Sequence, residues 1–261
     1  MNAPTISLHG KTAWITGGSS GIGRACALSL WQAGATVVIS ARSEAAIAGM
    51  VAGMVADCGN ERVIALPLDV SDREAVAAAG RQLQERVGAV DILVNAAGIN
   101  VPNRKLSRLT PADWDQVIDI NLNGAFYCMH AVLPGMRDKG EGTIINISSW
   151  AGRHASALTG AAYGASKHAM AAMTTSVAME ECANGIRACA IYPGETATPI
   201  LINRPTPPAA EDLARMLQPE DVAEAVAFVV SLPARATVNE LVISPTWNRA
   251  FVGFQPPPKR G

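Results

Sequence analysis

The sequence has no excess of positive charge. Its 21 Lys and Arg residues are balanced by 22 Asp and Glu, which gives a formal net charge of -1 over 261 residues. Proteins that bind nucleic acid or an anionic membrane usually carry a clear basic excess on one face. The charge balance therefore predicts a small molecule as the partner, with neither nucleic acid nor a membrane.

Cysteine is scarce and shows no metal-binding pattern. No two cysteines are spaced as CxxC or as zinc ligands, so we predict no metal. The opening MNAPTISLHGK lacks the basic and apolar regions of a signal peptide, and no apolar run approaches the roughly 18 residues of a membrane span. These absences predict a soluble cytoplasmic protein with free thiols. The five cysteines are Cys26, Cys58, Cys128, Cys182 and Cys189.

Short apolar runs rich in β-branched residues alternate with longer, alanine-rich stretches. The runs, predicted as strands, cover 12–16, 36–40, 62–68, 91–95, 143–148, 186–192 and 240–244. The stretches between them, predicted as helices, cover 22–33, 43–57, 72–88, 111–138, 161–184 and 219–231. Because the runs are apolar throughout, they indicate parallel strands covered by helices on both faces. The pattern predicts one α/β domain over 1–261, a doubly wound parallel sheet of about seven strands.

Several helix starts carry a local signal. Ser71 precedes DREAV, Thr110 precedes Pro111, and Pro219 opens EDVAEAVAF. The proline-rich stretch 203–212 is the one obvious irregular insertion, and we expect the end of the chain, 251–261, to be a loose tail.

A glycine-rich turn, TGGSSGIG at 16–23, directly follows the first predicted strand and opens a helix. Glycine lets the backbone turn tightly and approach a pyrophosphate, while a helix N-terminus offers free N–H groups and a positive dipole end. We therefore expect Gly17, Gly21 and Gly23 to cradle a dinucleotide. An isolated glycine motif could be an ordinary strand-to-helix turn, but the alternation of strands and helices around this one favours the nucleotide site.

The spacing TGxxxGxG resembles the short-chain dehydrogenase/reductase family rather than the GxGxxG of other dinucleotide-binding folds. The likeness continues, in the family's order, through Asp69-Val70, Asn95 to Gly98, Asn121, INISS (145–149), Tyr163 with Lys167 in YxxxK, and Tyr192-Pro193-Gly194. It implies a single-domain Rossmann fold and an NAD(P)-dependent oxidoreductase. The implied nucleotide contacts are Gly17, Ser19, Ser20, Gly21, Ile22, Gly23, Asp69, Val70, Asn95, Ala96, Gly98, Tyr163, Lys167, Pro193, Gly194, Thr196 and Thr198.

Tyr163 and Lys167 are four residues apart, so they are neighbours on one helix face. A free phenol has a pKa of about 10 and is a poor base at neutral pH. A nearby cation favours the phenolate and can lower such a pKa by roughly 1–3 units. We therefore expect Tyr163 to exchange a proton with the substrate oxygen while hydride passes to or from a nicotinamide.

The resemblance assigns two further catalytic residues. Ser149 is implied to hydrogen-bond the substrate oxygen, and Asn121 to bend its helix and position a water for proton relay. Ser148 is adjacent, and the interval from Ser149 to Tyr163 is one residue longer than in many relatives. We choose Ser149 because INISS aligns on Asn146, and neighbours on a strand point to opposite faces.

The end of the second predicted strand indicates which nicotinamide is used. An acidic residue there accepts hydrogen bonds from the adenosine ribose and repels a 2′-phosphate. Here Ala41 takes the acidic position, and Arg42 offers a planar cation suited to phosphate. NADP is therefore favoured, with NAD possible, although Ser20 takes the place of a second basic residue found in some relatives. Arg42 could also be an ordinary solvated residue at a helix start.

The substrate is weakly indicated. We expect pocket walls from 99–105, Trp150, His154 and Glu195, with 199–217 as a lid. Arg104 or Lys105 could bind a carboxylate, but solvated loop charges are the preferred interpretation.

The resulting hypothesis is an NADP-dependent enzyme that interconverts a secondary alcohol and a carbonyl compound, in a homotetramer or, second, a dimer. Two alternatives are a catalytically silent nucleotide-binding regulator and a sugar-nucleotide epimerase or dehydratase. The first would be expected to lose Tyr163 or Lys167, and the second usually has a TGxxGxxG turn and a larger C-terminal domain.

Overall fold

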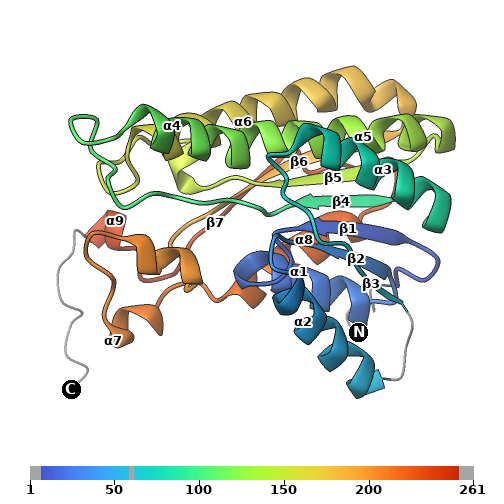
Figure 1. Cartoon of the computed structure of the whole chain (residues 1–261), viewed down its shortest axis with the longest axis horizontal. Coiled ribbons are helices and arrows are strands. Elements are labelled where there is room, and N and C mark those ends of the chain that lie inside the picture. The colour runs from blue at the N-terminus through green and yellow to red at the C-terminus, as the bar shows by residue number, and fades with distance from the viewer. Residues whose placement is uncertain (1–6, 59–61, 253–261) are drawn as a thin grey trace.

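A single parallel sheet forms the centre of the molecule. The computed structural model describes residues 7–58 and 62–252, so most of the predicted tail lies outside the described residues. The strands run in the order β3-β2-β1-β4-β5-β6-β7, all parallel, which confirms the predicted doubly wound sheet of seven strands (Figure 1). They are β1 Thr12–Thr16, β2 Thr36–Ser40, β3 Val63–Ala65, β4 Ile92–Asn95, β5 Gly142–Ile147, β6 Ile186–Pro193 and β7 Glu240–Ile243.

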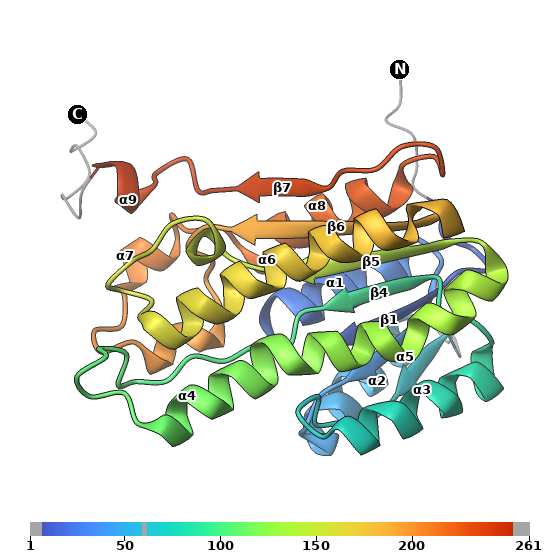
Figure 2. The same cartoon turned by 90° about the horizontal axis from the view of Figure 1, so that it is seen from above.

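Helices cover both faces of this sheet (Figures 1 and 2). One face carries α1 Gly21–Gln32, α2 Glu44–Cys58 and α8 Pro219–Ser231, and the other carries α3 Arg73–Val87, α4 Pro111–Ile118, α5 Gly124–Lys139 and α6 Ala161–Glu181. The shorter α7 Ala210–Leu213 and α9 Arg249–Val252 lie beyond the carboxyl ends of the strands.

The two faces have separate apolar cores. Ile15 packs with the α1, α2 and α8 layer, whereas Trp14, its neighbour on β1, packs with the α3 and α5 layer. Both side chains are fully buried. Because successive side chains of a strand point to opposite faces, a strand covered on both sides must be apolar through its middle, as β1 is between its terminal threonines.

Two predicted elements differ from those observed. The third strand is confined to Val63–Ala65, although the Leu66 and Leu68 N–H groups still donate to the Ile39 and Ala41 carbonyls on either side of Pro67. The helix predicted over 111–138 consists of α4, a π-helical turn over Asp119–Asn123, and α5. Such a turn bends a helix without ending it.

Helix caps follow the predicted signals with one correction. Thr110 caps α4, since its hydroxyl accepts a hydrogen bond from the Asp113 N–H, and Pro219 is the first residue of α8. For α3 the capping residue is Asp72 and not Ser71, because the Asp72 carboxylate accepts from the Ala75 N–H. Ser71 instead donates to Asp69. Over 7–58 and 62–252, no helix is long and apolar enough to cross a membrane.

Candidate active site

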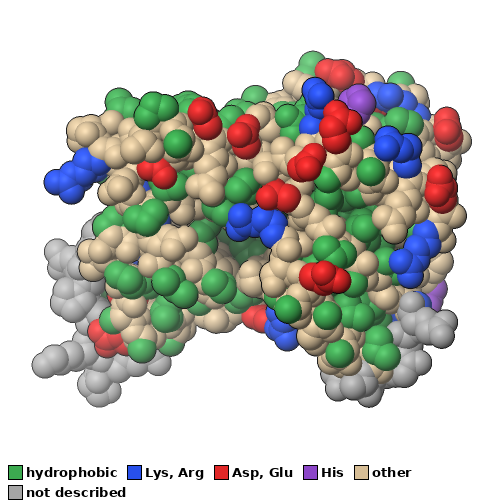
Figure 3. All heavy atoms as spheres, viewed as in Figure 1, with side chains coloured by type: hydrophobic (Ala, Val, Ile, Leu, Met, Phe, Trp, Pro, Cys, Tyr) green, Lys and Arg blue, Asp and Glu red, His purple; other side chains and the backbone are tan. Residues whose placement is uncertain are grey.

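A large cavity opens beyond the carboxyl ends of the strands. Its volume is about 1150 Å³, above the range of about 300–1,000 Å³ typical of small-molecule sites. Figure 3, which has the view of Figure 1, shows a hollow near the middle of the molecule with basic side chains beside it. Sheets of this kind bind ligands at this edge, where the connections on either side diverge.

The glycine turn between β1 and α1 forms one wall of the cavity. Gly17 has φ +64°, and a Cβ there would lie 2.7 Å from the Ala97 amide nitrogen, so no other residue fits without displacing the backbone. Most of the turn lines the cavity, and α1 begins within it at Gly21. The predicted residues in this wall are Gly17, Ser19, Ser20, Gly21, Ile22 and Gly23.

Arg42, Asp69 and Val70 line the far end of the same cavity, where β2 and β3 end. Partial burial raises the pKa of Asp69, but hydrogen bonds from the Ser71 hydroxyl and amide and the charge of Arg42 outweigh it, so the pKa lies below its usual value. The Arg42 side chain is exposed, and among the described residues it forms no salt bridge.

The segment after β4 lies between the glycine turn and the catalytic end. Ala96 and Gly98 line the cavity, but Asn95 does not, because its amide donates to Asn146 Oδ1 on β5 at 2.8 Å. Asn95 thus holds two central strands together behind the cavity wall.

Asn121 also lies behind the wall rather than in it. It occupies the π-helical turn and is fully buried. Its Oδ1 accepts from the Ile99 N–H at 2.8 Å, while its Nδ2 donates to the Ile99 carbonyl at 3.0 Å and to Ser166 Oγ at 3.1 Å. Asn121 therefore fixes the backbone after β4 against α6.

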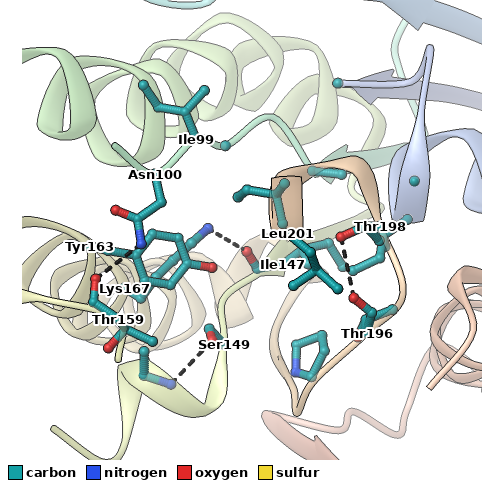
Figure 4. Close-up of a pocket in the computed structure, with 18 of the residues that line it drawn as sticks. Ile99, Asn100, Ile147, Ser149, Thr159, Tyr163, Lys167, Thr196, Thr198 and Leu201 are labelled. Atoms are coloured by element: carbon teal, nitrogen blue, oxygen red, sulfur yellow. Dashed lines mark hydrogen bonds between the residues drawn. The ribbon is translucent and has the colours of Figure 1, made fainter. Parts of the chain in front are cut away.

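The two serines that follow β5 have different environments. The Ser148 hydroxyl is buried and donates to the Lys167 carbonyl at 3.0 Å. Ser149 lines the cavity, and its hydroxyl accepts from the Ala151 N–H while pointing into the space beside the Tyr163 phenol (Figure 4). The arrangement supports the choice of Ser149 over Ser148.

Tyr163 and Lys167 enter the cavity from the first two turns of α6. The Lys167 ammonium donates to the Ile147 carbonyl at 2.8 Å and lies 5.7 Å from the centre of the Tyr163 ring (Figure 4). Ser149, Tyr163 and Lys167 are thus brought together from β5 and α6.

Burial governs the protonation of both groups. It lowers the pKa of Lys167 to about 8. Burial also raises the pKa of Tyr163, and this outweighs the opposing effects of hydrogen bonding with Ser149 and of the Arg104 and Arg204 charges. The Tyr163 pKa is therefore above its ordinary value here, not below it as the sequence predicts.

The remaining predicted contacts come from the segment after β6. Pro193, Gly194, Thr196 and Thr198 all line the cavity, and the Thr198 hydroxyl donates to the Thr196 carbonyl at 3.4 Å.

An ionic cluster ties this segment to the predicted lid. The Glu195 carboxylate accepts from Arg204 at 2.7 Å and from two nitrogens of Arg249 at 2.6 Å each. Arg249 also contacts Asp212 on α7 at 3.2 Å. Burial raises the pKa of Glu195, but the two arginines outweigh it and lower the pKa below its usual value. Arg204 and four other residues of 199–217 line the cavity, and charged side chains bind this segment to Glu195 and Arg249.

Arg104 corrects a sequence-based interpretation. Its side chain is only 7% exposed and lines the cavity, so it is not a solvated loop charge, whereas Lys105 is exposed. Trp150 and His154, also predicted walls, do line the cavity, with their ring centres 5.3 Å apart.

Asn100 lies in a predicted pocket wall and Arg204 in the predicted lid, but the sequence singles out neither residue. The Asn100 amide donates to the Thr159 carbonyl at 3.0 Å, which joins the segment after β4 to the loop before α6 (Figure 4). Arg204 comes from the proline-rich stretch, in which neither periodicity nor a motif distinguishes a buried arginine from a solvated one. The pairing of Arg204 with Glu195 depends on tertiary contacts alone.

Comparisons with known proteins agree with this architecture. Residues 11–208 match the family model described as short chain dehydrogenase. An uncharacterized oxidoreductase of Staphylococcus saprophyticus is 34% identical over 243 residues, which cover 92% of this chain and 99% of the relative. The cis-4-hydroxycyclohexanecarboxylate dehydrogenase of Sinomonas cyclohexanicum is 37% identical over 237 residues, which cover 89% of this chain and 94% of the relative. The solved structure of an alcohol dehydrogenase from the archaeon Thermococcus sibiricus, in complex with 5-hydroxy-NADP, has a TM-score of 0.82 at 28% identity. The match covers 92% of this chain and 98% of that one.

Proposed function

The chain belongs to the short-chain dehydrogenase family, an oxidoreductase family, and we propose that it interconverts a secondary alcohol and a carbonyl compound with NADP. The observation that carries the proposal is the convergence of Ser149, Tyr163 and Lys167 on a cavity whose opposite wall is the glycine turn. Relatives named as dehydrogenases of a hydroxycyclohexanecarboxylate and of an alcohol support the same reaction class.

The residues present fit a dinucleotide. The glycine turn packs so closely on the segment after β4 that a Cβ at Gly17 would meet the Ala97 backbone, and the N-terminus of α1 offers free N–H groups to the cavity for a pyrophosphate. The wall from Pro193 to Thr198 would hold the nicotinamide end, and Asp69 with Val70 the adenine end. When bound, the nicotinamide supplies or accepts the hydride.

Tyr163 is the proposed proton donor and acceptor. In reduction its phenol gives a proton to the substrate carbonyl oxygen, and in oxidation its phenolate takes the proton of the alcohol. Ser149 donates a hydrogen bond to the same oxygen and holds it at the phenol. Lys167 supplies positive charge from below the ring, and Asn121 holds the backbone of Ile99 so that the cavity keeps its shape.

Arg42 is the proposed determinant of NADP over NAD. It lines the cavity at the end of β2 and forms no salt bridge with any described residue, so its guanidinium can meet a 2′-phosphate. Ala41, at the usual acidic position, neither repels that phosphate nor accepts from a ribose hydroxyl.

A turnover screen tests the proposed reaction. NADPH and NADH are each mixed with a panel of ketones, aldehydes and oxo acids, and NADP with alcohols, while absorbance follows the reduced nicotinamide. Turnover with NADPH above that with NADH is expected. Cofactor binding without turnover of any compound would favour the silent regulator.

We further propose a cytoplasmic homotetramer, with a dimer second. The helices α4 and α5 run end to end beside α6 on one face (Figure 2), and the three present exposed apolar side chains, among them Trp114, Phe126 and Met179. Cys26, Cys128, Cys182 and Cys189 are free thiols, and all of these but Cys182 are buried, which suits a reducing compartment. Light scattering at micromolar concentration should give a mass of four chains, and a monomer would contradict the proposal.

A further inference from the structure

A buried arginine in the cavity has no acidic partner. The Arg104 side chain is 7% exposed, and no described Asp or Glu forms a salt bridge with it. Arginine is almost never buried unless it is paired, because an uncompensated charge away from water is costly. The absence of a carboxylate beside Arg104 therefore requires an explanation.

The hydrogen bonds of Arg104 use only some of the N–H groups of its guanidinium. Its Nε donates to the Val101 carbonyl at 2.9 Å, Nη1 to the Leu158 carbonyl at 3.0 Å, and Nη2 to the Asn203 carbonyl at 2.9 Å. A guanidinium carries five N–H groups, so one remains on each terminal nitrogen. Two N–H groups in one plane are the geometry that binds a carboxylate in a bidentate manner.

Holding the loops together does not require a positive charge. The neighbouring Asn100 joins the same segment to the same loop with a neutral amide, which donates to the Thr159 carbonyl. A neutral side chain of suitable length could likewise donate to the Leu158 and Asn203 carbonyls without the cost of burying an ion.

A second cation lies close to Arg104. The Arg204 side chain is 10% exposed, and its charge adds to burial in lowering the pKa of Arg104. Glu195, which pairs with Arg204, is shared with Arg249 and makes no salt bridge with Arg104. Two buried cations side by side repel each other, and an anion between them would remove that repulsion.

Arg104 is also close to the catalytic end. A Cβ at Gly160 would lie 2.6 Å from the Arg104 Cβ, so Arg104 packs against the beginning of α6, one turn from Tyr163. Its charge opposes the effect of burial on the pKa of Tyr163. Arg104, Arg204, Ser149 and Tyr163 all line one cavity.

We propose that the substrate carries a carboxylate, which Arg104 receives with Arg204 beside it, while the reacting carbon lies at Tyr163. The reaction is then the oxidation of a hydroxy acid to an oxo acid, or its reverse. The carbinol C–H bond gives hydride to NADP, the O–H proton passes to the Tyr163 phenolate, and the carboxylate stays unchanged. This inference rests on the proposed function and narrows its substrate class.

Matched pairs of acids and esters test the inference. NADPH-dependent reduction is measured for 2-oxobutanoate, 4-oxopentanoate and 3-oxocyclohexanecarboxylate, each beside its methyl ester. The wild type should reduce at least one acid about 10- to 100-fold more efficiently, in kcat/KM, than its ester, because the ester loses a charge-assisted hydrogen bond. Arg104→Gln should bring that ratio close to one, and Arg104→Lys should retain part of it. Lys105→Gln, at the exposed neighbouring cation, is the matched control and should keep the ratio.

Two results would overturn the inference. Equal efficiency with acids and esters in the wild type would do so while leaving the oxidoreductase proposal intact, since the esters are reduced. If Arg104→Gln lowers kcat/KM equally for an acid and its ester, Arg104 only holds the loops together. If Arg104→Gln does not fold, the acid-to-ester ratio of kcat/KM, measured in the wild type and in Arg204→Gln, decides between these outcomes.

A binding measurement separates this inference from the proposed function. If no carbonyl compound is reduced, the proposed function is wrong. The melting temperature of NADPH-loaded protein is then measured in the presence of each acid and in the presence of its ester. Stabilisation by an acid but not its ester, lost in Arg104→Gln, upholds the carboxylate site. Stabilisation by neither, or by both equally, overturns it.

Discussion

The Lys167 ammonium lies 5.7 Å from the centre of the Tyr163 ring, and it donates to the Ile147 carbonyl at 2.8 Å and to Met170 Sδ at 3.9 Å rather than to the phenol. Lys167 is therefore fixed by the end of β5 beneath a ring that is free to meet a substrate. Its burial lowers its pKa to about 8, so it loses its proton more easily than an exposed lysine.

The buried Lys167 should make stability rise with pH. The unfolded chain keeps this proton up to about pH 10.5, while the folded protein releases it near pH 8. Between these values the unfolded state binds more protons, so raising the pH favours folding, whereas below pH 8 both states are charged and the contribution is constant. For nucleotide-free protein, the free energy of unfolding relative to Lys167→Met should rise by about 2 kcal/mol between pH 7.5 and 9.5.

Urea unfolding at a series of pH values measures this difference. Lys105→Met, which removes an exposed lysine, serves as the control and should follow the wild type at every pH. A constant difference between wild type and Lys167→Met would show that Lys167 is as easily charged in the folded protein as in the unfolded chain.

Arg42 should set the preference between the two nicotinamides. Its replacement by Ala removes a charge-assisted contact to the 2′-phosphate, so NADPH affinity should fall on the order of 10- to 100-fold while NADH affinity hardly changes. Melting temperatures report this, because a ligand that binds the folded state stabilises it according to its concentration and dissociation constant.

The reversed variant makes the Arg42 test sharper. Ala41→Asp together with Arg42→Ala should favour NADH, since the new carboxylate repels phosphate and accepts from a ribose hydroxyl. Equal stabilisation of the wild type by the two nucleotides would contradict the NADP assignment and leave the catalytic residues untouched.

Glu195 should hold the segment 199–217 over the cavity. Glu195→Gln leaves Arg204 and Arg249 without the carboxylate that they share, at side chains that are 10% and 16% exposed. Removing one partner of a mostly buried ion pair is strongly destabilising, and here the effect should be local because the cluster lies outside the sheet. Amide hydrogen exchange in 199–217 should become about 10- to 100-fold faster.

The exchange experiment carries its own control. The amides of α1 and β4, which lie in the core, should exchange at the same rate in both proteins. Unchanged exchange in 199–217 would show that its backbone hydrogen bonds, such as that from the Leu217 N–H to the Glu195 carbonyl, suffice without the ion pairs.

Local patterns predicted the elements whose causes are local. β1 and β2 were predicted with their observed bounds because strands buried on both faces have apolar neighbours in succession, as Trp14 and Ile15 illustrate. The π-helical turn at Asn121 escaped prediction since one extra residue only shifts the phase of the hydrophobic pattern, and the pattern on both sides of it still reads as helix. Arg104 was misassigned for a related reason. Whether a loop arginine is solvated or buried depends on the Leu158 and Asn203 carbonyls, which are 54 and 99 residues away along the chain.

The most direct test of the account is the turnover of Tyr163→Phe beside its NADPH binding. The substitution deletes only the hydroxyl, so thermal stabilisation by NADPH should stay close to that of the wild type. Turnover of the best carbonyl substrate should fall by about 10²- to 10⁴-fold, the usual contribution of a positioned general acid or base. That combination is the result we predict. A Tyr163→Phe enzyme that keeps wild-type kcat would contradict the account, because some other group would then supply the proton.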